Sequence, residues 1–166
     1  RLFVALGLPD PVVRHVAMLR VRLPGARFST DEQTHLTLRF VGEVTDVDFR
    51  RLDDELASLE APSFELALAG LGHFSSRGAA RVLWVGVRPC DALFALAERV
   101  ERAVVRAGLP GETRTWKPHV TLARLGRTPG RDVARYLEAH GDFATAPFRV
   151  EDFRLYSSKK IGRAHV

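Results

Sequence analysis

The chain has 166 residues and a mass of 18.5 kDa, enough for one compact unit with a sizeable core. Apolar residues make up 46% and charged residues 27% of it, which excludes an extensively disordered chain and a membrane-embedded one. No apolar run approaches the roughly 18 residues that span a bilayer, so we expect a cytoplasmic protein. The single cysteine, Cys90, cannot form an internal disulfide and lacks the paired spacing of a zinc site.

The charge balance is basic, with 25 basic against 20 acidic residues and a net charge of +5. Lysine occurs only at Lys117, Lys159 and Lys160, so the other 22 basic residues (25 − 3) are arginines. Guanidinium groups bind phosphate as bidentate forks. The composition is therefore compatible with an anionic or nucleic-acid partner, although a bias in genomic base composition produces the same richness in arginine.

Strands and helices are expected to alternate through the first half of the chain. Apolar periodicity predicts strands over 2–6, 35–41 and 64–71, and helices over 10–22 and 46–59. Asp10-Pro11 offers an N-cap and first-turn pair for the first helix, and Thr45 or Asp46 can cap the second.

The second half repeats this order. The pattern predicts strands over 82–87, 119–124 and 148–156, and helices over 91–107 and 131–140. The second histidine strand lies 84 residues after the first (119 − 35 = 84), and Phe148 follows Phe64 by the same offset (148 − 64 = 84). We interpret this as a pseudo-duplication. It predicts one domain over 1–166 made of two lobes, approximately 1–75 and 80–158, that meet at a cleft lined by equivalent elements; exchange of strands between the lobes stays open. Residues 73–81 are expected to form a joining loop, and 159–166 carry little pattern.

Two tetrapeptides stand out, His35-Leu36-Thr37-Leu38 and His119-Val120-Thr121-Leu122. Both have the form His-x-Thr-x with apolar residues at x. Because successive side chains of a strand face opposite sides, each motif presents an imidazole and a hydroxyl on one face and turns its apolar residues into the core. The duplication supplies this pair twice.

Two facing imidazoles can serve as a general acid and a general base near neutral pH. Two threonine hydroxyls can donate hydrogen bonds to an anion between them, and a nearby arginine can neutralise its charge. This set suits a phosphodiester, in which water attacks phosphorus in line and the opposite leaving oxygen takes a proton. A metal site is a poorer interpretation, because no carboxylate ligand stands at strand spacing.

The choice of arginine stays open at this point. Strict alternation places Arg39 on the face of His35, whereas Arg124 lies opposite His119 unless the strand ends or bulges there. Phe40 and Trp116 adjoin the motif strands and could stack on a base, but Phe40 alternates onto the apolar face, where core packing is expected. The remaining histidines carry no motif and are expected at the surface or at helix ends; they are His15, His73, His140 and His165. Cys90 is expected to be structural.

The sequence resembles the 2H phosphoesterases, and in particular the bacterial and archaeal RNA 2',3'-cyclic phosphodiesterases, also described as 2'-5' RNA ligases. The resemblance covers nearly the whole chain, and both motifs are complete. It rests on the segments 1–6 (RLFVAL), 35–43 (HLTLRFVGE), 81–87 (RVLWVGV), 117–124 (KPHVTLAR) and 155–158 (LYSS).

This resemblance implies an α+β fold of two pseudo-symmetric lobes, each an antiparallel sheet with helices outside and the active-site cleft between them. It implies hydrolysis of 2',3'-cyclic phosphate ends to 2'-phosphates without metal or other cofactor. By motif position, His35 is the proton donor, His119 the proton acceptor, and Thr37, Thr121 and Arg124 bind phosphate. The implied partners are RNA with cyclic phosphate ends or cyclic nucleotides, with no membrane, and we expect a monomer.

Three alternatives stay open. The same acid and base run backward would serve a 2'-5' RNA ligase, and a 2'-5' phosphodiesterase could use the same site. A non-catalytic RNA-end binding module is the third, although its expected signature, a lost motif histidine or threonine, is absent from the sequence. The tail after Ser158 departs from the family pattern and ends early, so contacts made by a longer C-terminus are not expected to carry over.

Overall fold

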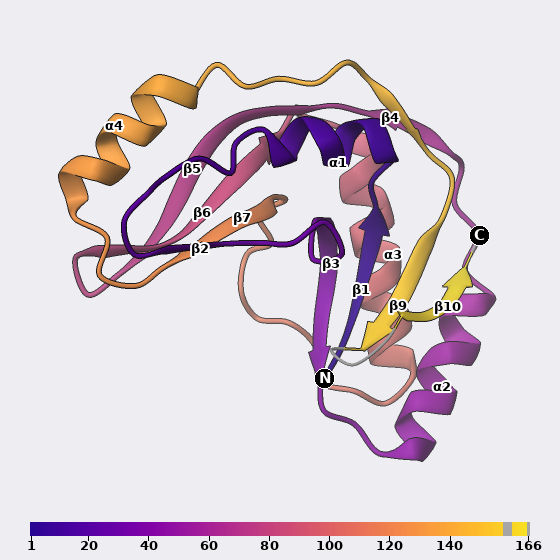
Figure 1. Ribbon diagram of the computed structural model, residues 1–166. Helices are drawn as coiled ribbons and strands as arrows, with labels where there is room; N and C mark the ends of the chain where they lie inside the picture. Colours follow the sequence, from indigo (N-terminus) through magenta and orange to yellow (C-terminus); the bar gives the residue numbers. More distant parts are fainter. Residues whose placement is uncertain (158–160, 166) are drawn as a thin grey trace.

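The computed structural model describes residues 1–157 and 161–165, and these residues form four helices and ten strands (Figure 1). The helices are α1 (Asp10–Ala17), α2 (Asp46–Ala57), α3 (Asp91–Arg106) and α4 (Gly130–His140). The strands are β1 (Leu2–Gly7), β2 (Ala26–Phe28), β3 (His35–Gly42), β4 (Phe64–Leu66), β5 (Leu68–Ser76), β6 (Ala79–Val87), β7 (Val120–Leu125), β8 (Phe148–Val150), β9 (Phe153–Ser157) and β10 (Ile161–His165).

Antiparallel pairing organises the strands into two sheets. The larger runs in the order β10-β9-β1-β3-β7-β6-β5, with β2 paired beside β7, and the smaller consists of β4 and β8. The class is therefore α+β with antiparallel sheets, as expected. The two motif strands, β3 and β7, are neighbours at the middle of the large sheet and meet at a single pair, Leu36 with Val120.

The pairing follows the 84-residue offset. Leu36 and Val120 are related by it (120 − 36 = 84) and pair with each other. In the small sheet Phe64 pairs with Val150 and Leu66 with Phe148. Phe148 and Val150 follow Phe64 and Leu66 by 84 residues, so this pairing is also symmetric under the offset. In the large sheet β1 lies between β3 and β9, and β6 lies between β7 and β5. Each half of the sheet thus takes its third strand from the other half of the sequence.

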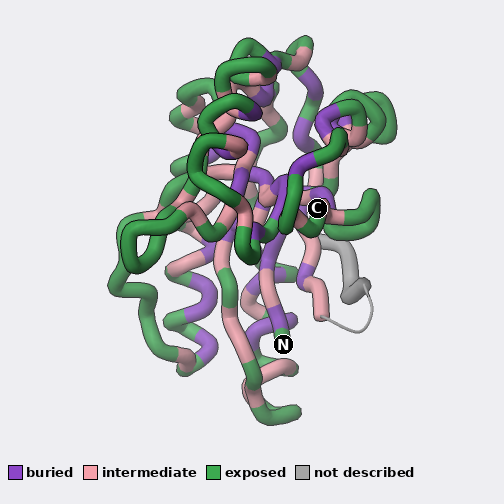
Figure 2. Tube along the Cα trace, turned by 60° about the vertical axis from the view of Figure 1, so that its left-hand side comes forward, coloured by how far each residue is buried: buried purple, intermediate pink, exposed green. Residues whose placement is uncertain are grey.

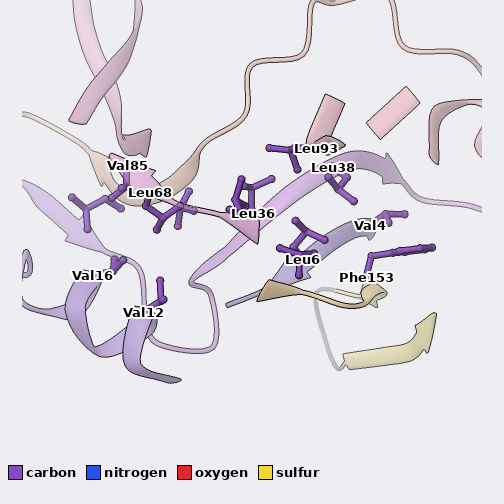
Figure 3. Packing of buried hydrophobic residues seen from close by; sticks show 14 of the residues in the cluster. Val4, Leu6, Val12, Val16, Leu36, Leu38, Leu68, Val85, Leu93 and Phe153 are labelled. Carbon is purple, nitrogen blue, oxygen red and sulfur yellow. The ribbon is translucent and has the colours of Figure 1, made fainter. Parts of the chain in front are cut away.

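The core lies between the large sheet and the helices. Helix α3 contacts β3, and Figure 1 shows it behind β1. Leu93 of α3 and the alternate strand residues Val4, Leu36 and Leu38 belong to one buried cluster (Figure 3). Figure 2 shows the buried segments gathered along the middle of the molecule. The motif strands therefore have one face fixed against the core, and the other face is available for a site.

Several predicted boundaries were wrong. The first helix ends at Ala17 instead of residue 22, and its N-cap is Pro9, one residue before the expected Asp10. The apolar pattern continues beyond the helix because Leu19 and Leu23 are buried in the turns that follow. Thr45, in contrast, caps α2 as expected and accepts a hydrogen bond from the backbone N–H of Asp48.

The segments predicted as strands 64–71 and 148–156 each divide between the two sheets, as β4 with β5 and β8 with β9. The expected joining loop over 73–81 was also wrong, because β5 and β6 form a hairpin there. Its two-residue turn, Arg77-Gly78, has positive φ at both positions (53° and 75°), the conformation that matches the twist of paired strands.

Two strands gave no signal in the sequence. Strand β2 has only three residues, and β10 lies in the tail that was expected to carry little pattern, where it pairs with β9. The expectation for the rest of the tail, residues 158–160 and 166, lies outside the described residues.

Candidate active site

Four motif side chains gather where β3 meets β7. Around the antiparallel pair Leu36–Val120, the register sets His35 opposite Thr121 and Thr37 opposite His119. Leu36 and Val120 are completely buried, so the four polar side chains project from the other face. The histidine and threonine of both motifs thus belong to one face of the sheet, on neighbouring strands.

Both motif strands contain a β-bulge directly after the threonine. On β3, Ala5 pairs with Thr37 and Val4 with Arg39, which leaves Leu38 without a partner. On β7, Trp84 pairs with Thr121 and Leu83 with Ala123, which leaves Leu122 without one. The two bulged leucines are again 84 residues apart (122 − 38 = 84). The extra residue of a bulge shifts the alternation of the side chains that directly follow it to the opposite faces.

The bulges decide which arginine reaches the site. The expectation that alternation places Arg39 on the face of His35 was wrong, because the bulge at Leu38 turns Arg39 toward α3. There Arg39 binds Glu101, with 2.7 Å between Nε and Oε2, and donates to the carbonyl of Pro110 at 2.6 Å. The bulge at Leu122 has the opposite effect and turns Arg124 onto the face of Thr121, into the cleft.

Phe40 takes the place that alternation had given to Arg39. The expectation that Phe40 packs in the core was wrong: it is 48% exposed and lines the cleft. It is also the residue of β3 that corresponds to Arg124 by the 84-residue offset (124 − 40 = 84). Trp116, the other aromatic residue considered for stacking, packs edge-on against Phe94 and donates from its indole N–H to the carbonyl of Thr37 at 3.2 Å. Through this hydrogen bond Trp116 helps to hold the backbone of β3 in place.

Aromatic rings hold His35. Phe3 lies nearly parallel to the imidazole with 4.9 Å between ring centroids, and Tyr156 lies nearly parallel to it at 5.6 Å. Burial lowers the pKa of His35 below its ordinary value, and the backbone of Glu32 offsets part of this effect. Burial also raises the pKa of Tyr156, so the phenol keeps its proton at neutral pH. His35 is therefore a fixed imidazole that gives up a bound proton readily.

A backbone carbonyl orients His119. Its Nδ1 lies 2.7 Å from the carbonyl oxygen of Lys117. A carbonyl can only accept, so Nδ1 carries the hydrogen and the lone pair of the neutral ring is on Nε2. Phe74 packs edge-on against the ring, with 4.8 Å between centroids. This is the tautomer that a base needs if it is to take a proton at Nε2.

The open face of the sheet is hollowed into a cleft of about 1310 Å³. Its lining includes four of the five predicted site residues, His35, Thr37, Thr121 and Arg124; the fifth, His119, directly precedes β7 and is not part of the lining. The cleft is also lined by residues that sequence reasoning missed, among them Arg27, Phe3 and Tyr156. Arg27 gave no signal because the three-residue strand that carries it was not predicted.

Among the other histidines with described side chains, none lines the cleft. His15 and His73 are exposed, and His140 is half-buried in the last turn of α4; the side chain of His165 lies outside the described residues. Among the described side chains, no three of His, Cys, Asp and Glu come together in a way that could hold a metal ion. None of the described helices has the length and apolar character needed to cross a bilayer.

The fold and the pair of histidines on adjacent strands are those of the 2H phosphoesterases. Within this class the chain belongs to the 2'-5' RNA ligase superfamily, whose profile matches residues 8–161. Solved structures agree: Escherichia coli LigT in its apo form superimposes with a TM-score of 0.74 at 26% identity, covering 99% of this chain and 92% of that one. The same protein complexed with 3'-AMP gives 0.73 at 27% identity over the same shares.

Curated relatives carry the name RNA 2',3'-cyclic phosphodiesterase. That of Archaeoglobus fulgidus is 29% identical over 161 residues, covering 95% of this chain and 90% of the relative. That of Aeropyrum pernix is 35% identical over 130 residues, covering 77% and 74%. The Escherichia coli protein is 31% identical over 162 residues, covering 95% and 86%.

Proposed function

We propose that this protein hydrolyses 2',3'-cyclic phosphate ends of RNA, or the corresponding cyclic nucleotides, to 2'-phosphates, by general acid-base catalysis without a metal ion. The observation that supports the proposal is the antiparallel pairing of the motif strands at Leu36 and Val120, whose buried side chains leave the histidine and threonine of both motifs on the open face of the sheet. The names of the curated relatives agree with it. We also propose that the duplicated halves are two lobes of a single domain, with their third strands exchanged and the site between them.

His119 is the proposed base. The Lys117 carbonyl fixes the proton on Nδ1, so Nε2 can take a proton from a water molecule as its oxygen bonds to phosphorus. His35 is the proposed acid: its protonated ring gives a proton to the 3'-oxygen as the bond from phosphorus to that oxygen breaks. One proton is taken up and one is released, so proton exchange with solvent restores the starting state.

Three donors are proposed to hold the phosphate. The hydroxyls of Thr37 and Thr121 stand on the same face as the imidazoles, and Arg124 follows Thr121 on that face because of the bulge. A phosphodiester carries one negative charge, which spreads over its nonbridging oxygens as water attacks. Fixed donors aimed at those oxygens stabilise the transition state more than the free substrate.

The nucleoside is proposed to lie toward β1 and β9. In the sheet, Phe3 stands between Phe40 on β3 and Tyr156 on β9. All three rings line the cleft, and Phe40 is the most exposed of them. An exposed ring beside a phosphate site can stack on a base, with a contribution of about 1–3 kcal/mol.

The experiment that tests this function is hydrolysis of adenosine 2',3'-cyclic phosphate in the presence of EDTA, with identification of the product isomer. We expect the wild type to release adenosine 2'-phosphate and His119→Ala to lose at least a hundredfold in kcat. His140→Ala, which removes a histidine from α4 outside the cleft, is the matched control and should retain the wild-type rate. Release of the 3'-phosphate, or full activity in His119→Ala, would contradict the proposal.

A further inference from the structure

A second arginine stands beside Arg124 in the cleft. Strand β2 pairs with the outer end of β7, and in that register Arg27 lies directly opposite Arg124. Directly opposite residues of an antiparallel pair point to the same face, with their Cβ atoms about 4.5–5.5 Å apart. Both side chains are exposed, and both line the cleft.

Neither arginine forms an ion pair with a carboxylate of the described residues. Three carboxylates also line the cleft, those of Asp10, Asp31 and Glu32, but within the described part of the chain none of them forms an ion pair with Arg27 or Arg124. Asp31 is bound to Arg20 instead, at 2.7 Å. Like charges directly across a sheet destabilise it, so an arrangement of this kind is relieved when anions bind between or beside the two guanidinium groups.

One phosphate does not match both charges. The cyclic phosphate carries a single negative charge, and the proposed site already gives it Arg124 and two threonine hydroxyls. Arg27 lies on the short strand β2, which among the described strands pairs with β7 alone, along the same edge of β7 that meets β3 at Val120. Arg27 and Arg124 thus stand side by side at the end of β7 away from the Leu36–Val120 pair. With Cβ atoms about 4.5–5.5 Å apart, the second guanidinium can bind the next phosphate along a nucleotide chain while Arg124 binds the reacting one.

We propose that Arg27 binds the phosphate on the 5' side of the terminal nucleotide, and that it makes the enzyme prefer RNA ends over cyclic mononucleosides. The inference rests on the proposed function and extends it from the reacting group to the substrate class. Contacts to backbone phosphates position a nucleic acid without reading its sequence, so the preference for a second phosphate should not depend on the base.

Three substrates test the inference. They are adenosine 2',3'-cyclic phosphate, the same compound with a 5'-phosphate, and the dinucleotide ApA ending in a 2',3'-cyclic phosphate. In the wild type, kcat/KM should be higher for the two compounds that carry a second phosphate. In Arg27→Gln this advantage should shrink about tenfold. Arg27→Lys keeps the charge and should retain part of the advantage.

The matched control is Arg135→Gln, which removes the same charge from an exposed position of α4 outside the cleft. It should leave the ratio between substrates at the wild-type value. Loss of one ionic phosphate contact should also make kcat/KM for the dinucleotide less sensitive to salt than in the wild type. An equal loss on all three substrates in Arg27→Gln, or no loss on any, would overturn the inference.

Failure of the inference can be distinguished from failure of the proposed function. If the wild type turned over none of the three substrates, the proposed function would be wrong, and equilibrium binding would still test Arg27. Arg27→Gln should then weaken adenosine 2',5'-bisphosphate about tenfold more than adenosine 2'-phosphate in calorimetry. Equal weakening of the two ligands would overturn the assignment of Arg27.

Discussion

The two motif strands match up to their bulges and differ directly after them. Each presents a histidine and a threonine, and each then bulges at a leucine, Leu38 on β3 and Leu122 on β7. The next side chain turned into the cleft is Phe40 on one strand and Arg124 on the other. The duplicated motifs thus each supply one imidazole and one hydroxyl. The cleft-facing residue after the bulge differs, so Phe40 gives the cleft an aromatic end and Arg124 gives it a cationic end.

Under the proposed function, this difference fits a pseudo-symmetric site to an asymmetric substrate. A nucleoside and a phosphate need different surfaces, one apolar and stackable and the other positively charged. The aromatic end also contains Phe3 and Tyr156, which lie against His35, and the cationic end contains Arg27. The same asymmetry gives the two histidines different surroundings, so identical imidazoles can take different roles.

The largest expected effect comes from removing the charge of the cationic end. Arg124→Gln should lower kcat by about 10² to 10³, the range seen when one fixed donor to a developing negative charge is lost. The measurement is the steady-state rate on adenosine 2',3'-cyclic phosphate, with Arg135→Gln as the control. A rate within twofold of the wild type would mean that Arg124, although the bulge turns it into the cleft, does not stabilise the phosphate.

Removing the Phe40 ring from the aromatic end should have a smaller effect, and this effect should fall on substrate binding. Phe40→Ser loses a stacking surface worth about 1–3 kcal/mol, which corresponds to a rise in KM of roughly 5- to 150-fold with a smaller change in kcat. Phe40→Tyr keeps the ring and should behave like the wild type. Equal KM values for Phe40→Ser and the wild type would show that the base lies elsewhere.

Arg39 offers a test of the bulge on β3. Because that bulge turns Arg39 toward Glu101 on α3, Arg39→Ala should lower the free energy of unfolding by about 1–2 kcal/mol, measured by urea denaturation. It should leave the kcat of the folded enzyme unchanged. Arg106→Ala, which breaks a more exposed pair with Glu55, should cost less than about 1 kcal/mol. A loss of kcat in folded Arg39→Ala would contradict this account and indicate that Arg39 binds the phosphate.

The smallest effect concerns His35 and the dependence of stability on pH. Burial lowers the pKa of folded His35 below the ordinary value of 6.5, so below pH 6.5 the unfolded chain binds this proton more tightly than the folded one. The contribution of His35 is full above pH 6.5 and is lost as the pH falls through the lowered pKa. His35→Gln should therefore lose less unfolding free energy than the wild type between pH 7.5 and pH 5. Equal losses would contradict a lowered pKa.

Local features of this fold could be predicted from the sequence, and features that depend on pairing could not. Alternation located the motif strands, and the apolar positions of the motifs are buried as expected. The bulge on β3 was not predicted, and that on β7 stayed an open possibility, because Leu38 and Leu122 are ordinary strand residues and only pairing with β1 and β6 reveals the extra residue. Alternation therefore placed Arg39 and Phe40 on the wrong faces. The family resemblance had favoured Arg124, and the structure places its side chain in the cleft.

The rest of the site depends on contacts between distant segments. Arg27 and Arg124 face each other because a three-residue strand joins the outer end of β7, and such a strand is too short for a periodic signal. The hairpin turn at Arg77-Gly78 did carry a signal, a glycine between two apolar strands, but the surrounding polar residues suggested a loop. The division of residues 64–71 between two sheets gave no signal in the sequence.

The roles of the two histidines can be separated most directly with a substrate that needs no acid. In a cyclic phosphate with sulfur in place of the 3'-oxygen, the leaving group is a weaker base and departs without a proton. We predict that the activity of His35→Ala on this compound approaches that of the wild type, while His119→Ala stays impaired at least a hundredfold. Equal defects of His35→Ala on the oxygen and sulfur substrates would contradict the assignment of His35 as the acid.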